Sequence, residues 1–115
     1  MTDPAGLVGR DWLVAEVAGT PAPDDDPPSL RFDPDGRVSG STGINRLAGD
    51  YELVGGVVTV GPLALTRMAG PPDRMELESA VVAALGSELG VVAEGDGVRL
   101  GAGSGLLLRP AAPSG

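Results

Sequence analysis

The chain has 115 residues, a length suited to one domain that buries a hydrophobic core. Its 16 acidic and 8 basic residues give a net charge of -8, which disfavours binding to nucleic-acid phosphates and to anionic membranes. The absence of cysteine, histidine and lysine excludes disulfides, thiolate metal sites and the usual activating bases of serine or threonine nucleophiles.

The amino-terminal segment shows neither a basic region nor an apolar run of signal-peptide length, and no segment approaches the ~20 apolar residues that cross a bilayer. We therefore expect no membrane insertion and a cytoplasmic location. The 19 glycines and 11 prolines fall between short apolar runs, a spacing typical of a turn-rich β protein.

The first forty residues predict three strands. Residues 11–18 are rich in strand formers, and residues 19–28 form a proline-rich loop. Leu30 and Phe32 lie on one face of a second strand, because side chains alternate between the two faces. Residues 33–36 have turn composition, so residues 37–41 are expected to return as a third, antiparallel strand.

A hairpin and the single helix follow. Residues 49–54 and 57–60 flank Gly55-Gly56, which suits a primed two-residue turn, and residues 62–68 form a further extended segment. Asp73 is expected to be the helix N-cap, with Glu76 three residues later.

The helix carries an apolar stripe that we expect to pack on the sheet, while its charged residues lie away from most of that stripe. Gly86 or Gly90 is expected to end the helix. The stripe is Leu77, Val81, Ala84 and Leu85, and the charged residues are Arg74, Glu78 and Glu88.

Three short strands are expected at residues 91–94, 97–100 and 105–109, followed by a frayed tail at 110–115. Many strands, one helix and further strands predict an α+β fold. We expect a curved, mostly antiparallel, barrel-like β-sheet with one α-helix packed on it, in a single domain over residues 1–115 with a core at about 7–110.

The sequence resembles the META domain, also called the HslJ-like domain of bacterial heat-shock and secreted proteins. The resemblance covers about residues 7–110. It rests on Trp12-x-Val14-x-x-Val17-x-Gly19, Leu30-x-Phe32, Val38-Ser39-Gly40-x-x-Gly43-x-Asn45-x-x-x-Gly49-x-Tyr51, Thr66-Arg67-Met68-Ala69 and Met75-x-x-Glu78.

This resemblance implies a barrel-like α+β domain without known catalytic activity or cofactor, associated with stress tolerance, drug resistance and the cell envelope. The residues that it marks as a structural motif are Gly40, Gly43, Asn45, Gly49, Tyr51, Thr66, Arg67 and Met68.

The chain departs from the family pattern at two positions. Ile44 and Gly70 stand where members usually carry cysteines, and the usual export signal is not seen. The resemblance implies that such cysteines would join the motif turn to the segment before the helix. Losing both together fits a reducing compartment, where the bond is not needed.

Two groups within the motif have alternative interpretations. For Asn45 we favour a structural role, with its amide satisfying nearby backbone groups as in Asx-type turns, over contact with a ligand. Arg46 and Arg67 could jointly hold a carboxylate or phosphate. We favour the alternative that they form surface ion pairs, with Asp50, Glu52 or Glu76 as partners.

Other chemistry-bearing residues give weak signals. Three consecutive acids, Asp24, Asp25 and Asp26, are expected to form a solvated loop, and Asp33-x-Asp35-Gly36 lacks the other positions of a calcium loop. We expect no metal site. The hydroxyls of Ser39, Ser41 and Thr42 lack an activating histidine or lysine, so we expect no enzyme activity.

The leading functional hypothesis is a non-catalytic, stress-associated interaction module, whose sheet surface or edge binds a protein partner or a second copy. The alternative is a carrier of a small apolar ligand inside the curved sheet. A hydrolase is a third and much weaker interpretation.

Overall fold

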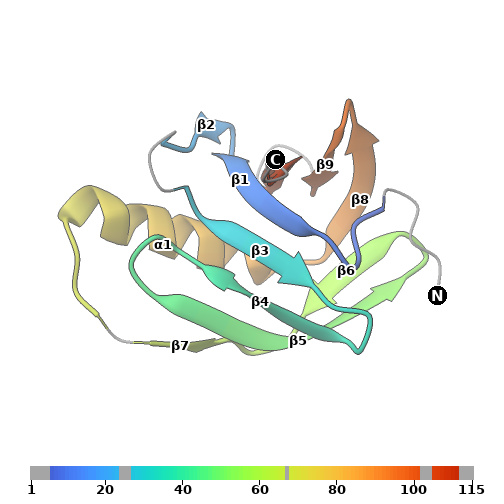
Figure 1. Ribbon diagram of the computed structural model, residues 1–115, viewed down its shortest axis with the longest axis horizontal. Coiled ribbons are helices and arrows are strands. Elements are labelled where there is room, and N and C mark those ends of the chain that lie inside the picture. The colour runs from blue at the N-terminus through green and yellow to red at the C-terminus, as the bar shows by residue number, and fades with distance from the viewer. Residues whose placement is uncertain (1–5, 24–26, 67, 102–104, 112–115) are drawn as a thin grey trace.

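The computed structural model describes residues 6–23, 27–66, 68–101 and 105–111. These residues contain ten strands and one helix. Figure 1 shows their arrangement. The strands are β1 (Asp11–Val17), β2 (Thr20–Pro21), β3 (Ser29–Phe32), β4 (Arg37–Ser41), β5 (Arg46–Val54), β6 (Val57–Val60), β7 (Ala64–Leu65), β8 (Leu89–Glu94), β9 (Gly97–Leu100) and β10 (Leu106–Pro110), and the helix is α1 (Pro72–Leu85).

The sheet is antiparallel between its named strands and closes on itself. Its order is β10-β9-β8-β6-β5-β4-β3-β1-β2, and β10 also pairs with β1, from Trp12 opposite Pro110 to Val17 opposite Leu106. Strands β2 and β7 have two residues each and pair with β1 and β5 outside this ring. The predicted α+β fold with a curved, barrel-like sheet is confirmed, and ring closure leaves only short free edges among the described strands.

Local sequence explains the surest turn. Gly55 and Gly56 connect β5 to β6 with φ of 59° and 77°, the left-handed values that a primed hairpin turn requires. The predicted hairpin is therefore confirmed, with Val54 paired to Val57.

Side chains from the strands and from α1 fill the interior as one hydrophobic cluster. Trp12 is 1% exposed, and its Nε1 donates a hydrogen bond of 2.8 Å to the carbonyl oxygen of Leu7. Phe32 and Tyr51 meet edge to face with ring centres 5.1 Å apart. Tyr51 also donates through its hydroxyl to the Asp33 carbonyl oxygen at 2.6 Å, so this ring joins the core to the β3–β4 turn.

Helix α1 confirms its predicted apolar stripe but not its predicted cap. Val81, Ala84 and Leu85 are buried, as expected, and Leu77 is partly buried against the same hydrophobic cluster. Asp73 is not the N-cap: the helix begins at Pro72, Pro71 occupies the cap position, and no side chain caps it. Proline suits the first helical position because its φ is already helical and its missing N–H has no intrahelical partner there.

The helix ends at Leu85 before Gly86, one of the two predicted ends. It has 14 residues, and no helix within the described ranges is long and apolar enough to cross a membrane.

Some strand boundaries differ from the predictions. Strand β5 begins three residues earlier, at Arg46, because its first half pairs with both β4 and β7. Strand β8 begins at Leu89 because it pairs there with β6. The predicted loop 19–28 contains β2, and only Ala64–Leu65 of the predicted extended segment is a strand. These differences arise from long-range pairing, which single-strand propensity does not report.

Candidate functional site

The side chain of Asn45 lies where the β4–β5 connection, the segment before α1 and α1 itself meet. It is buried, with 3% exposed. Its Oδ1 accepts from the Met68 backbone N–H at 2.7 Å and from Thr66 Oγ1 at 2.9 Å. Its Nδ2 donates to the Met68 carbonyl oxygen at 3.1 Å and to Glu78 Oε2 at 2.8 Å. The oxygen and the nitrogen of this amide therefore both form hydrogen bonds to residues that are distant in sequence. This differs from the predicted role within the local turn.

The local turn role belongs to Thr42, which is fully buried. Its Oγ1 accepts from the backbone N–H of Asn45 at 3.0 Å and donates to Glu78 Oε2 at 2.7 Å. Glu78 is half-buried and receives two hydrogen bonds at one carboxylate oxygen. The helical spacing predicts that Glu78 lies away from most of the apolar stripe of the helix. It instead ties α1 to the connection between β4 and β5, and we call Thr42, Asn45, Thr66, Met68 and Glu78 the Asn45 corner.

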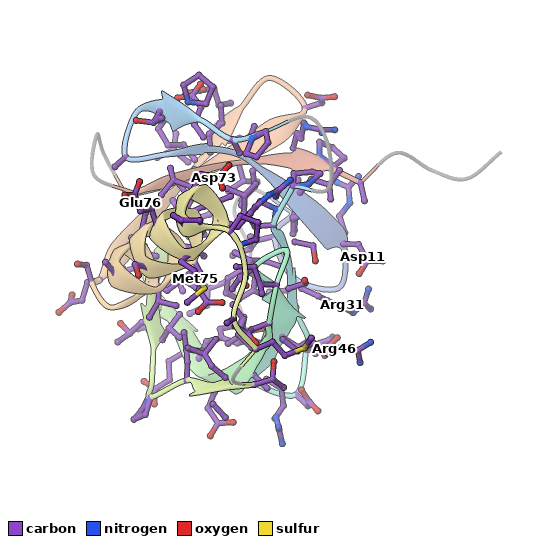
Figure 2. All side chains as sticks on the ribbon, turned by 90° about the vertical axis from the view of Figure 1, so that its left-hand side faces the viewer. Asp11, Arg31, Arg46, Asp73, Met75 and Glu76 are labelled. Carbon is purple, nitrogen blue, oxygen red and sulfur yellow. The ribbon has the colours of Figure 1, made fainter. Side chains whose placement is uncertain are left out.

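Met68 is fixed through its backbone while its side chain faces solvent. Asn45 holds both its N–H and its C=O, yet Met68 is 63% exposed. Met75, on α1, is 37% exposed, and Figure 2 shows it on the helix near Asp73 and Glu76. A hollow of about 410 Å³ includes both methionines in its lining. Its lining residues are Asn45, Leu65, Thr66, Met68, Ala69, Met75 and Glu78.

Arg46 opens β5 on the other side of Thr66, whose Oγ1 accepts from the Arg46 backbone N–H at 2.9 Å. Its side chain is exposed, and among the described residues no carboxylate lies within ion-pair distance of it. The predicted pairing of Arg46 with Asp50, Glu52 or Glu76 is thus not found there; Asp50 Oδ1 lies 3.8 Å from Arg37 Nε instead. Arg67, the proposed second cation, lies outside the described residues.

The acids of the predicted turn at residues 33–36 have arginine or backbone partners. Asp33 Oδ1 accepts from Arg31 Nε at 2.7 Å, and Asp35 Oδ1 accepts from the Arg37 N–H at 3.1 Å. Hydrogen bonds to Asp33 and, to a smaller extent, Asp11 raise the pKa of the Arg31 guanidinium above its ordinary value. No group of three or more potential metal ligands occurs in the part of the chain that the structure describes. The acids at 24–26 lie outside it.

The remaining motif glycines fit close backbone approaches. A Cβ on Gly40 would collide with the Ser29 carbonyl oxygen, and a Cβ on Gly49 would lie 2.9 Å from Leu63 Cδ2. Gly43 adopts φ of 95° in the connection that precedes Asn45. These residues shape the sheet and the corner rather than offer chemical groups.

Ile44 and Gly70 are neighbours across the corner. A Cβ built on Gly70 would lie 2.8 Å from Ile44 Cδ1 and 3.1 Å from its Cγ1 and Cγ2. The isoleucine side chain therefore occupies the space that a larger residue at position 70 would need.

The sequence hypotheses did not single out Thr42 or Glu78 as parts of the corner. The available signal was the Met75-x-x-Glu78 spacing on the helix. The three hydroxyls that were considered as nucleophiles lie on β4 or in the connection after it. Ser39 lies on β4, and Ser41 Oγ accepts a hydrogen bond from the Gly43 N–H at 3.1 Å. The Thr42 hydroxyl donates a hydrogen bond to Glu78.

Comparisons with known proteins agree with the fold. An NMR structure is 28% identical, with 96% of each chain covered and a TM-score of 0.74. An NMR structure of a protein from Burkholderia xenovorans is 24% identical, covering 98% of this chain and 93% of that chain, with a TM-score of 0.72. No curated protein matches. The family model of the META domain matches residues 5–112, nearly the whole sequence, and the chain therefore belongs to the META domain family.

Proposed function

We propose that this META domain is a non-catalytic interaction module that binds a protein partner at the Asn45 corner, with Met68 and Met75 as the apolar contacts. The observation that carries the proposal is the combination at Met68. Both of its backbone groups are held by a buried amide, while its apolar side chain is 63% exposed.

This arrangement lowers the entropic cost of binding. A mobile loop would lose conformational freedom on contact with a partner, whereas the Met68 backbone is already held by Asn45. The methionine side chain is flexible and polarisable, so it adapts to an apolar partner surface. The hollow of about 410 Å³ beside Met68 and Met75 gives room for one apolar side chain of the partner.

The surroundings support binding in preference to catalysis. The chain has no histidine, lysine or cysteine, and the carboxylate at the corner, Glu78, already accepts two hydrogen bonds. Buried side chains fill the barrel interior, so we do not propose that the protein carries an apolar ligand there. The described free edges are short, which favours a surface contact over strand addition. A stress-associated role remains part of the proposal, through the family resemblance alone.

Site-specific photo-crosslinking tests the proposal in cells of the source organism. A diazirine amino acid replaces Met68 in one variant and Val54 in a second, because Val54, 71% exposed, is a matched exposed apolar residue at the β5–β6 turn. We expect one defined crosslinked protein from position 68, absent from position 54 and lost when Met75→Asp is added. Equal crosslinking from both positions, or none from position 68, would overturn the proposal.

A further inference from the structure

Three arginines extend from one outer face of the β3–β4–β5 region. Arg31 is paired in register with Ser39, Arg46 with Ser41, and Arg37 with Asp50. Because residues two apart on a strand share a face, Arg37, Ser39 and Ser41 point to the same side of β4. Figure 2 shows Arg31 and Arg46 on one side of the molecule, away from the labelled acids Asp73 and Glu76 of α1.

Only one of these three cations lacks an acidic partner among the described residues. Arg31 binds Asp11 at 3.1 Å and Asp33 at 2.7 Å. Arg37 lies 3.8 Å from Asp50. Arg46 has no such partner, so its guanidinium keeps all of its side-chain donors available for a bound anion.

Arg46 borders a groove of about 670 Å³, a volume that suits a small organic molecule. Ser39 and Ser41 supply hydroxyls to its lining. Ser41 Oγ accepts from the Gly43 N–H and keeps its own proton to donate, and Ser39 makes no hydrogen bond through its side chain within the described residues. The rest of the lining is mainly small or apolar: Gly40, Leu47, Ala48, Ala64, Leu65 and Thr66.

We propose that this groove binds the carboxylate of a small organic acid, with the guanidinium of Arg46 and the hydroxyls of Ser39 and Ser41 as donors. The apolar part of the acid lies along Ala48 and Ala64, because the register places these two residues on the same face as Ser39. The net charge of -8 selects against phosphate, because the protein's field repels a dianion about twice as strongly as a monoanion. The site does not depend on a protein partner at the Asn45 corner.

The test is an NMR titration of 15N-labelled protein with sodium hexanoate, with acetate and inorganic phosphate as separate arms at equal ionic strength. We expect saturable shifts of the Ser39, Ser41 and Arg46 signals with hexanoate, weaker binding of acetate, whose tail is shorter, and weaker binding of phosphate. Arg46→Gln is expected to weaken hexanoate about tenfold, because a charge-assisted contact is lost. Ser39→Ala is expected to weaken it about threefold, as expected for a neutral hydrogen bond.

Arg37→Gln is the matched control, since Arg37 lies on the same face but is paired with Asp50. It should change hexanoate affinity less than twofold. Equal weakening by Arg46→Gln and Arg37→Gln would show general electrostatics and overturn the site. Tighter binding of phosphate than of hexanoate would overturn the carboxylate assignment, and so would an absence of saturable shifts.

Discussion

Asn45→Ala tests how much the buried amide contributes to the fold. The substitution removes four hydrogen bonds, of 2.7, 2.8, 2.9 and 3.1 Å. At about 0.5–1.5 kcal/mol each, the sum is roughly 2–6 kcal/mol. Water can reach the exposed Met68 and Thr66, so we expect the lower half of that range, about 2–4 kcal/mol. For a chain of this size the melting temperature should fall by about 10–20 °C.

Urea unfolding followed by the fluorescence of the buried Trp12 measures this loss, with an unchanged m-value showing that the denatured state is not altered. Asn45→Asp is the informative companion, because it keeps the acceptor of the Met68 N–H but sets a second carboxylate beside Glu78. It should be unstable at pH 7 and recover as acid lets the two carboxylates share a proton. A loss below about 0.5 kcal/mol for Asn45→Ala would refute the reasoning.

Two further predictions concern other parts of the fold. Gly70→Ala should lower the free energy of unfolding by about 1–3 kcal/mol, because the new methyl group overpacks against Ile44. When Ile44→Ala is added, the double variant should lose less stability than the sum of the two single losses, and additive losses in urea unfolding would contradict this contact. Arg99→Gln should raise the pKa of Glu94, because the hydrogen bonds from Arg99 hold that pKa below its ordinary value. The stability that this pair adds is therefore present at pH 7 and disappears as the pH falls through the depressed pKa of Glu94. Carboxyl NMR titration and unfolding at pH 7 and pH 3 check this prediction, and an unchanged Glu94 titration would contradict it.

The architecture was predictable because its signals are local. The two-residue spacing of Leu30 and Phe32 predicted one face of a strand, the glycine pair at 55 and 56 predicted a hairpin, and helical spacing predicted that Val81 and Leu85 face the core. Barrel closure through β1 and β10 joins the two ends of the chain, and no local pattern reports such a pairing. The helix start was misplaced because Asp73 has the composition of a cap, whereas the two prolines before it decide the conformation.

The Asn45 corner was predictable only in part. The glycine-spaced motif identified the right segment, but the partners of its amide lie 21 to 33 residues away. The identity of these partners depends on how α1 packs against the sheet, and the spacing of residues within one segment gives no information about that packing. The same reason explains why Glu78 was expected among the residues that avoid the packing face.

The central claim is that Asn45 holds the Met68 backbone in place. Hydrogen exchange at the Met68 backbone amide tests it most directly, because this N–H lies in an exposed segment and donates its hydrogen bond to a side-chain atom, Asn45 Oδ1. We predict that the Met68 N–H is protected nearly as strongly as the core strands in the wild type, and exchanges as a mobile loop does in Asn45→Ala. Fast exchange in the wild-type protein would show that Asn45 does not hold Met68 in place, and would contradict the account.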